Sequence, residues 1–401
     1  MGEWRTKTLG DLVKLQRGLD LPASKRKDGN VPIMGSFGVT GYHNRASVSG
    51  PGVTIGRSGA SIGIVSFVEV DYWPLNTCLY VKNFLGNNPQ FIYYFLNTLN
   101  LSHYNSGSAQ PSLNRNYIYP IIVRFPERSE QDKIVDLLAA LDDKVELNRR
   151  ANATLEAMAR ALFKDWFVDF GPTRAKMAGA PPYLAPDLWN LFPPTLDEQG
   201  VPTGWERRPL DQIAEFLNGL ALQKYPAQEG QASLPVIKIA EMRGGISSKS
   251  NRASLDVPEK YVVKNGDFIF SWSGSLMAKF WTEGQGALNQ HLFKVTSANY
   301  PSWLYSLWVQ HYLEEFQAIA ASKATTMGHI QRSHLKAAMT VCPTRGSLKR
   351  FNAVVSPLIN QTIRNQLESR SLAATRDLLL PKLMSGEIRV KDAEVAAAEA
   401  L

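Results

Sequence analysis

The stretch WRTKTLGDLVKLQRGL (residues 4–19) returns in outline as WERRPLDQIAEFLNGL (residues 205–220). Both stretches begin with tryptophan, carry apolar residues at the same positions and end in Gly-Leu. The matched residues are Trp4/Trp205, Leu9/Leu210, Leu12/Ile213, Leu15/Phe216, Gly18/Gly219 and Leu19/Leu220. Because a repeat at this offset divides the 401-residue chain into two similar halves, we expect a duplicated architecture.

Three further segments of the first half recur in the second. They are RSGAS (57–61) as WSGSL (272–276), PLNTCLYV (74–81) as ALNQHLFK (287–294), and PSLNRN (111–116) as GHIQRS (328–333). In the second pair, Leu75 aligns with Leu288 and Asn76 with Asn289. The offset grows along the chain, which indicates longer loops in the second copy. Short apolar stretches near turn residues predict a mixed α/β globule in each half.

Each globule is followed by a long helical pattern, in which seam residues alternate at spacings of four and three. The first seam is Ile134, Leu138, Leu141, Val145, Asn148, Asn152, Leu155, Ala159, Leu162 and Trp166. The second is Phe351, Val355, Leu358, Thr362, Asn365, Ser369, Leu372, Arg376, Leu379 and Leu383. This spacing is typical of a helix packed along another helix. Each pattern runs for about 40 residues, or roughly 60 Å of helix.

Some residues also predict where these helices begin, end or bend. Ser129 is a candidate N-cap of the first helix, with Asp132 placed as in a capping box. Gly171 and Pro172 are expected to stop it. Pro357 is expected to bend the second helix.

The middle of both seams is polar. Asn148, Asn152 and Asn365 can form a central amide layer that fixes the register of the pair at a cost in stability. Alternatively, these side chains face solvent. The polar layer fits parallel and antiparallel pairing alike. We favour the antiparallel arrangement, because a twofold axis across the helix pair closes it more naturally.

The predicted fold class is α+β, with two mixed α/β domains in a pseudo-twofold arrangement, separated by two long antiparallel coiled-coil helices. The predicted parts are a first globule (1–128), a first long helix (129–170), a connector rich in proline and aromatic residues (171–204), a second globule (205–346), a second long helix (347–386) and a mobile tail (387–401). Two basic globules held apart by a stiff helix pair are well placed to bind a nucleic-acid duplex at two separate patches.

Composition narrows the class of protein. Hydrophobic residues make up 44% and charged residues 20%, which supports large folded cores. The sequence has no apolar run long enough for a transmembrane helix, and its start has no secretory signal, so we expect a cytoplasmic protein without a membrane partner. Cys78 and Cys342 indicate a reducing compartment without structural disulfides. The formal charge of +8 is compatible with a polyanionic partner.

Basic residues among small polar ones are the candidates for DNA contact. Arg can form bidentate hydrogen bonds with guanine, and Asn or Gln can do so with adenine. The candidates are Lys25, Arg26, Lys27, His43, Arg45, Arg57, Asn114 and Arg115 in the first globule, and Arg243, Lys249, Arg252, His329, Gln331 and Arg332 in the second. For any one of them, a solvated loop position is an equal alternative.

Matching positions suggest a shared task, and differing positions suggest base choice. Arg115 and Arg332 match between the copies, so phosphate anchoring or support of the fold is expected there. The better candidates for base readout are His43, Arg45, Asn114, Lys249 and Gln331.

The segment LFKDWFVDFGP (162–172) places four aromatic rings at the end of the first helix, namely Phe163, Trp166, Phe167 and Phe170. We favour a docking surface for a partner, because such a patch exceeds what the seam can bury. Leu380 and Met384 are the aliphatic counterparts in the second helix. The alternative is that the connector at 183–192 folds back and covers the rings.

The sequence gives little support for catalysis. GRSGASIG (56–63) lacks the Gly-Lys-Ser/Thr ending of a phosphate-binding loop. FPPT (192–195) lacks the acidic or amide residue of an amino-methyltransferase motif. No His/Cys cluster has metal-ligand spacing, so no metal or cofactor is expected on this chain.

Several segments together resemble the specificity subunit of type I restriction–modification systems. LEAMARALFKDWFVDFGPTRAK (155–176) and LAATRDLLLPKLMSGEIRV (372–390) are similar to the two constant regions of that family, and residues 2–18 and 202–219 resemble the starts of its target-recognition domains. The resemblance implies a non-catalytic subunit that reads a split, asymmetric target in double-stranded DNA. It also implies two modification subunits, which methylate adenine with S-adenosylmethionine, and two restriction subunits, which use ATP.

Two other classes of function stay open at this point. One is a stand-alone DNA-binding regulator that dimerises through its helices. The other is an enzyme of a type that the sequence motifs do not reveal.

Overall fold

The computed structural model describes residues 4–106, 111–322 and 328–398. The chain divides into two compact units. Unit 1 comprises residues 1–146 and 368–401, and unit 2 comprises residues 147–367. Each unit therefore contains one globule together with a part of both long helices.

The globule of unit 1 contains three small sheets. The strands β1 (Arg5–Thr8) and β9 (Ile122–Phe125) form an antiparallel pair. A four-stranded antiparallel sheet has the order β2 (Lys14–Arg17), β8 (Cys78–Asn83), β5 (Gly52–Gly56) and β6 (Val65–Val68). A third sheet has the order β4 (Gly38–His43), β3 (Val31–Gly35) and β7 (Trp73–Pro74).

Helices complete this globule. They are α1 (Leu9–Leu12), α2 (Pro89–Thr98) and α3 (Arg115–Ile118). Asn88 caps α2, because its side chain accepts hydrogen bonds from the backbone N–H groups of Gln90 and Phe91. α2 packs on β5 and β6, and its Phe91 and Phe95 lie against Phe125 of β9 in the core.

The globule of unit 2 repeats this plan. The strands β10 (Glu206–Pro209) and β19 (Met339–Cys342) form the antiparallel pair. The four-stranded sheet has the order β11 (Glu215–Asn218), β18 (Leu292–Thr296), β15 (Phe268–Ser271) and β16 (Ala278–Phe280). The other sheet has the order β13 (Arg252–Ser254), β12 (Ser233–Ile237), β17 (Gly286–Leu288) and β14 (Val262–Val263). The helices are α7 (Leu210–Ile213), α8 (Ile239–Gly244), α9 (Ser302–His311), α10 (Leu313–Ser322) and α11 (Arg332–Ala337).

Backbone hydrogen bonds confirm the duplication and correct one detail of it. Gly18 N donates to Cys78 O at 3.0 Å, and Gly219 N donates to Leu292 O at 3.0 Å. Cys78 therefore corresponds to Leu292, and Leu75 corresponds to Asn289 rather than to Leu288. The sequence alignment was one residue out in this segment, because Leu-Asn occurs in both copies and attracts the wrong pairing.

The same hydrogen bonds explain the shared glycines. A Cβ on Gly18 would lie 2.1 Å from Leu75 O, and one on Gly219 would lie 2.2 Å from Asn289 O. Any side chain would push these strands apart, so glycine is required at both positions.

The two long helices are α4 (Arg128–Phe163) and α12 (Arg345–Ser385). α4 starts at Arg128, so the predicted cap at Ser129 is wrong. It ends in a π-helical turn (Lys164–Val168), and Phe170 then adopts a left-handed conformation with φ 54°. Gly171 and Pro172 begin the next helix, α5 (Gly171–Met177), and do not themselves end α4. α12 continues through Pro357 without interruption.

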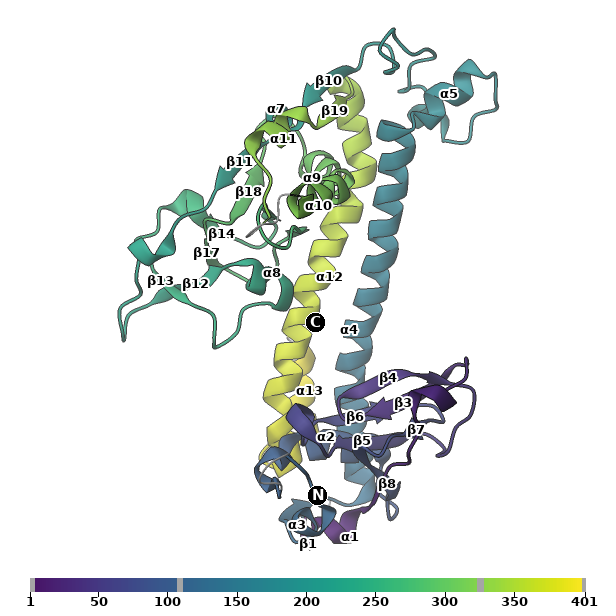
Figure 1. Ribbon diagram of the computed structural model, residues 1–401, viewed down its shortest axis with the longest axis vertical. Helices are drawn as coiled ribbons and strands as arrows, with labels where there is room; N and C mark the ends of the chain where they lie inside the picture. Colours follow the sequence, from purple (N-terminus) through teal and green to yellow (C-terminus); the bar gives the residue numbers. More distant parts are fainter. Residues whose placement is uncertain (1–3, 107–110, 323–327, 399–401) are drawn as a thin grey trace. The chain divides into compact units, whose positions relative to one another are not determined.

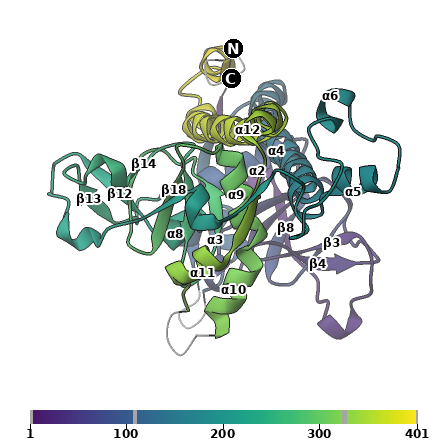
Figure 2. The same ribbon diagram turned by 90° about the horizontal axis from the view of Figure 1, so that it is seen from above.

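α4 and α12 lie side by side and run antiparallel (Figures 1 and 2). In unit 1, Lys144 Nζ lies 3.3 Å from Glu368 Oε1. In unit 2, Asn152 pairs with residues 362 and 365. The residue number rises along one helix as it falls along the other, as expected for the favoured arrangement. Seam residues of both helices belong to the cores, for example Leu138 and Leu372 in unit 1.

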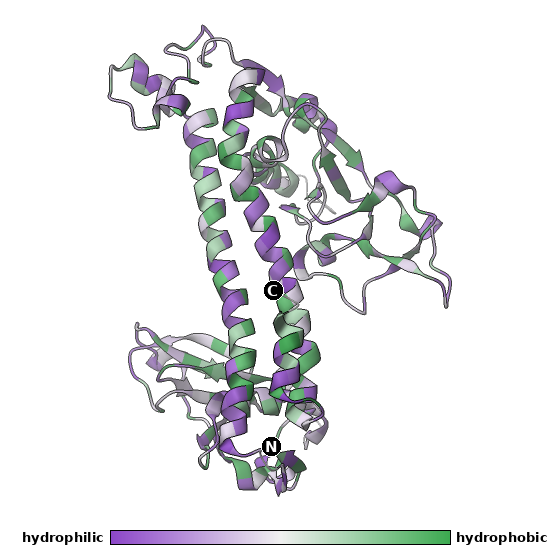
Figure 3. Ribbon diagram, turned by 180° about the vertical axis from the view of Figure 1, so that it is seen from behind, coloured by the Kyte–Doolittle hydropathy of each residue, from purple (hydrophilic) through white to green (hydrophobic). Residues whose placement is uncertain are grey.

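The polar layer of the seam is buried in unit 2. Asn365 Nδ2 donates to Asn152 Oδ1 at 2.8 Å, and Asn152 Nδ2 donates to Thr362 O at 3.2 Å. Asn148 Nδ2 lies 3.4 Å from Asn365 O. The solvent-facing alternative is wrong, because Asn148, Asn152 and Asn365 are all buried. Figure 3 shows the hydrophilic stretch in the middle of both helices.

The predicted mobile tail is wrong for the described part of it. Residues Val390–Ala398 form helix α13, whose Val390, Ala393 and Ala397 are buried in the core of unit 1. Small apolar residues at helical spacing make this contact possible. Residues 399–401 lie outside the described part of the chain.

Both cysteines are free and buried. Burial raises the pKa of the Cys78 thiol to about 12, and it also raises the pKa of Cys342. Among the described residues, no helix is long and apolar enough to cross a membrane.

Replacing Asn365 with alanine should lower the free energy of unfolding by about 1–3 kcal/mol, because it leaves the buried amides of the layer without partners. Urea denaturation followed by circular dichroism measures this change. The control is Asn360→Ala on the exposed face of the same helix, where a change below about 0.5 kcal/mol is expected. Equal losses in the two variants would contradict a structural role for the amide layer.

Candidate nucleic-acid interface

Three loops meet at one end of the four-stranded sheet of unit 1. Arg57 N donates to Thr77 O at 3.0 Å, and Leu113 N donates to Arg57 O at 2.8 Å. Ser58 and Ser112 form an isolated antiparallel bridge beside these bonds. We call residues 57–59, 76–77 and 112–115, together with Arg17 at the end of β2, cluster 1.

Guanidinium groups dominate cluster 1. Arg57 is half-buried, and its Nη1 lies 3.5 Å from Asn76 O. Burial lowers the pKa of Arg57, and the charge of Arg17 lowers it further. Arg115 Nη1 donates to Leu15 O at 3.0 Å. Asn114 is exposed but caps α3, because its Oδ1 accepts from Asn116 N at 3.0 Å.

Unit 2 builds the same loop junction. Ile330 N donates to Trp272 O at 3.0 Å, and Gly274 N donates to Gly328 O at 2.8 Å. Ser273 and His329 form the bridge that corresponds to Ser58 and Ser112. We call residues 272–274, 290–291 and 329–332, together with Asn218 at the end of β11, cluster 2.

Cluster 2 has Asn218 and Trp272 at the positions where cluster 1 has Arg17 and Arg57, while each cluster keeps one matched arginine. Trp272 Nε1 donates to Asn218 Oδ1 at 2.8 Å. Ser273 Oγ and His291 Nδ1 lie 2.9 Å apart. The rings of His291 and His329 lie 5.9 and 6.3 Å from the ring of Trp272.

The matched arginines have the same structural role in both units. Arg332 Nη2 donates to Phe216 O at 3.1 Å, as Arg115 does to Leu15 O. Arg332 also lies over the ring of Phe293 at 5.6 Å. Each guanidinium thus ties a loop to a strand end. Support of the fold was one of the two roles expected for this matched pair. Both side chains stay exposed enough to contact a phosphate as well.

The remaining basic candidates of unit 1 gather on another loop pair. His43 Nδ1 accepts from Lys27 N at 3.1 Å, and the His43 ring lies edge-on to Trp73 at 5.6 Å. His43 is therefore a buried support for the loop, and its prediction as a readout residue is wrong. Lys25, Lys27 and Arg45 are exposed beside it, and Arg26 is half-buried.

The remaining candidates of unit 2 are dispersed. Arg243 lines a pocket of about 410 Å³ with Gly274 and Gly328, at the edge of cluster 2. Arg252 shares a pocket of about 430 Å³ with Lys238 and Asn289, and its Nε donates to Ser233 Oγ at 3.0 Å. Lys249 is exposed on the loop before β13. Gln331 is exposed at the start of α11, within cluster 2.

Sequence reasoning missed several residues of the two clusters, namely Arg17, Asn76, Asn218, Trp272, Gln290 and His291. The corrected alignment is the signal that could have found some of them. It matches Asn76 with Gln290 and Thr77 with His291, two positions at which the copies differ.

Comparisons with known proteins identify the family of this duplicated chain. The profile of the family described as the type I restriction modification DNA specificity domain matches residues 1–157 and 202–339, well over half of the chain. The chain belongs to this family. It is a specificity subunit of a type I restriction–modification system.

Individual relatives support this assignment along most of the sequence. The specificity subunit of the type I restriction enzyme MjaIX of Methanocaldococcus jannaschii is 26% identical over 348 residues, which are 82% of this chain and 76% of the relative. The HindI specificity subunit of Haemophilus influenzae is 25% identical over 356 residues, 75% of this chain and 77% of the relative.

A solved structure agrees in fold. The crystal structure of a type I restriction–modification S subunit from M. genitalium matches with a TM-score of 0.60 at 13% sequence identity. The match covers 95% of this chain and 96% of that one.

The aromatic segment at the end of α4 is part of the core of unit 2 of the specificity subunit. Phe163 lies edge-on to Trp308 at 4.9 Å, and Phe167 stacks on Trp205 at 5.5 Å. Trp166 packs against Phe192 of the connector at 5.7 Å. All four rings are buried, so the prediction of an exposed docking patch made of Phe163, Trp166, Phe167 and Phe170 is wrong.

The connector covers part of this aromatic segment, as the alternative proposed, and the second globule and α12 cover the rest. Lys176 Nζ donates to Phe192 O at 2.6 Å, and Tyr183 Oη donates to Asp165 Oδ2 at 2.9 Å. Burial raises the pKa of Asp165. The aliphatic counterparts also face inward, since Met384 is buried and Leu380 is half-buried against the core of unit 1.

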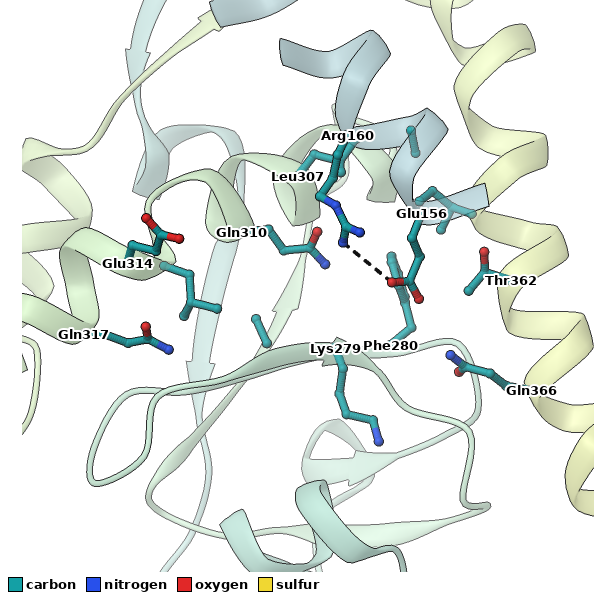
Figure 4. Close-up of a pocket in the computed structure, with 14 residues that line it drawn as sticks. Glu156, Arg160, Lys279, Phe280, Leu307, Gln310, Glu314, Gln317, Thr362 and Gln366 are labelled. Carbon is teal, nitrogen blue, oxygen red and sulfur yellow. Dashed lines mark ion pairs between the residues drawn. The ribbon is translucent and has the colours of Figure 1, made fainter. Parts of the chain in front are cut away.

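A pocket of about 470 Å³ lies in unit 2 between the helix pair, β16 and the helices α9 and α10 (Figure 4). Its wall carries mixed charges. Arg160 and Glu156 form an ion pair at 3.5 Å, and Lys279 and Glu314 lie nearby on other elements. This balance of charges does not make an anion site. Over the described residues, no group of three or more His, Cys, Asp or Glu side chains could hold a metal ion.

Truncating Phe167 to alanine should lower the free energy of unfolding by about 3–5 kcal/mol, because the ring is fully buried among other rings. Denaturant titration of the full chain, followed by tryptophan fluorescence, provides the measurement. Tyr104→Ala, which removes an exposed ring, serves as control and should change stability by less than about 0.5 kcal/mol. A stable F167A chain would restore the docking interpretation.

Proposed function

We propose that this specificity subunit reads a bipartite, asymmetric target in double-stranded DNA, with cluster 1 contacting one half and cluster 2 the other. The observation that carries the proposal is the pair of matched loop junctions. Their backbone hydrogen bonds match, while the side chains around them differ in charge and type. A shared frame with different side chains is what two unequal half-sites require.

The chemistry of the clusters suits this task. Cluster 1 offers guanidinium groups, which bind guanine edges and phosphates. Cluster 2 offers amide, imidazole and indole groups, which donate and accept hydrogen bonds and stack on sugars or bases. The formal charge of +8 favours association with a polyanion before any base is read.

We propose that catalysis belongs to partner subunits. In this proposal two modification subunits methylate adenine with S-adenosylmethionine, and two restriction subunits use ATP. The chain itself then needs no cofactor. The MjaIX and HindI relatives, each named as the specificity subunit of a restriction enzyme, support such a division of labour.

Because the aromatic rings are buried, another surface must dock the partners. Large apolar side chains are exposed on the outer faces of the long helices. Leu147 and Met158 on α4 in unit 2 are 60% and 48% exposed, and Leu378 on α12 in unit 1 is 61% exposed. Exposed apolar residues on a rigid helix are typical anchors of a protein interface. We assign partner docking to these faces.

The stand-alone regulator has lost its main support. That hypothesis needed the helix seams to bind a second chain. In this fold the seams of α4 and α12 pack against each other within one chain. They are therefore not available to bind the helices of a second chain.

Exchanging the globule of unit 1, residues 1–127, for that of another specificity subunit should change one half of the recognised motif and keep the other. The expectation follows because each cluster is built within one unit. Co-expression with modification subunits and sequencing of the methylated genome gives the motif. The unexchanged chain serves as reference, and it should yield methylated adenines in a split motif. Alteration of both halves would contradict modular reading.

Leu147→Glu should weaken co-purification with the modification subunit at least tenfold, because a charge at an apolar contact must be desolvated. The affinity is measured by titration of the purified partner. Leu255→Glu is the control, since Leu255 is similarly exposed but lies outside the long helices. Both variants should keep the unfolding midpoint of the wild type. Equal binding by the two variants would exclude this face of α4 from docking.

A further inference from the structure

We propose that Arg17 and Arg57 form a two-guanidinium site that binds hydrogen-bond acceptors of the DNA half read by unit 1. The inference rests on the DNA-reading function proposed above and names the residues that would give this half-site its identity. The site combines a residue that sequence reasoning missed with one that it included among many.

The fold places both residues beside the first residues of β8. In the strand order β2-β8-β5, β8 lies between the other two. Arg17 ends β2 and pairs with Leu79 of β8. Arg57 directly follows β5, and its N–H donates to Thr77 O just before β8 begins. The two arginines therefore flank the same strand end.

Unit 2 shows that side chains at these two positions reach each other. Asn218 corresponds to Arg17 and Trp272 to Arg57, and the indole N–H of Trp272 donates to Asn218 Oδ1 at 2.8 Å. In that unit the pair is neutral and satisfied internally. In unit 1 the same positions carry two like charges, which cannot satisfy each other.

The charges of the pair are not balanced within unit 1. Neither Arg17 nor Arg57 forms an ion pair with any carboxylate in residues 4–106, 111–322 or 328–398. Asp20, three residues beyond Arg17, accepts instead from Asn76 Nδ2. The segment 107–110 contains no acidic residue in its sequence.

This arrangement costs free energy in the absence of a ligand. Arg57 is half-buried and close to a second cation, and both effects lower its pKa. Across the described ranges of the chain, its guanidinium has a hydrogen bond only to a backbone carbonyl, from Nη1 to Asn76 O at 3.5 Å. A ligand with several acceptor atoms would relieve the repulsion and use the remaining N–H donors. Guanine O6 and N7, or phosphate oxygens, have this geometry.

The third guanidinium of the cluster has a different role. Arg115 is tied to Leu15 O, and Arg332 of unit 2 makes the equivalent bond. A residue common to both units cannot distinguish two half-sites. Unit 2 has other residues at the positions of Arg17 and Arg57, so these two arginines can distinguish the half-sites.

The test uses the full chain in complex with its modification subunits. The double variants are R17Q/R57Q, which removes both charges, and R17K/R57K, which keeps the charges but removes the forked donors. The control is K82Q, because Lys82 is exposed near the other end of β8. The methylated motif and the salt dependence of binding to a duplex carrying the wild-type motif are measured. Unfolding midpoints verify folding, and R17Q alone replaces the double variant if that variant does not fold.

If the pair reads guanine, R17Q/R57Q and R17K/R57K should both relax the motif in one half, with a loss of about 5- to 150-fold in discrimination at the affected base pair. If it holds phosphates, the motif should stay and R17Q/R57Q should weaken binding to all sequences. The slope of log affinity against log salt should then fall by about 0.9 for each lost contact, and the lysine variant should restore it. Either result supports the two-guanidinium site and identifies its acceptors as guanine edges or as phosphate oxygens.

The opposing outcomes separate the two proposals. If R17Q/R57Q keeps the wild-type motif and its affinity within twofold, as K82Q should, the acceptor site is overturned and the proposed function stands. If the wild-type complex yields no split methylated motif, the proposed function fails and the acceptor site fails with it.

Discussion

The antiparallel contact between α4 and α12 is the constraint on which the rest of the chain depends. Each unit takes a part of both helices into its core, so neither globule is complete without residues from distant parts of the sequence. Apolar seam positions alone would permit slippage by a turn, because they repeat. The buried amides of Asn152 and Asn365 do not repeat, and a shifted register would bury them without partners. The amide layer thus lowers the stability of the helix pair locally and selects one register of α4 against α12.

A second constraint separates the backbone frame of each globule from the side chains that surround it. The frame is held by backbone hydrogen bonds, by two glycines that admit no side chain, and by an arginine on a strand-end carbonyl in each unit. These features recur in both units because they are needed to close the loops. The side chains around them are free to change, since Arg57 and Trp272 occupy the same position without altering the junction. Such a frame allows these side chains to change without disturbing the backbone of the junction.

Periodicity made the long helices and their seams predictable, because burial along a helix leaves a mark at every third or fourth residue. The duplication was likewise visible from Trp4 and Trp205 onward. The burial of Trp166 and Phe167 was not predictable, because it depends on how the connector and the second globule pack against the end of α4, which the sequence does not specify. The burial of His43 was not predictable either, because it depends on packing against Trp73 and on the hydrogen bond from Lys27 N, two contacts that the sequence does not reveal. Helix α13 was missed because its apolar residues are mostly alanines, which give a weak pattern.

The two clusters also differ in the physical basis of recognition. A guanidinium pair acts through charge, so its contribution depends on ionic strength and on the acceptors that face it. In the proposed function, the indole and imidazole rings of cluster 2 would act through stacking and hydrogen bonds, which depend less on salt than contacts of a guanidinium pair with phosphates. In the part of the chain that the structure describes, Trp272 is held by Asn218, whereas the Arg57 guanidinium has a hydrogen bond only to a backbone carbonyl. Under the proposed function, cluster 2 is therefore preorganised and cluster 1 would be completed by its ligand. Under the proposed function, two copies of one frame would therefore divide the work of binding, with unit 1 supplying the electrostatic share and unit 2 the shape-dependent share.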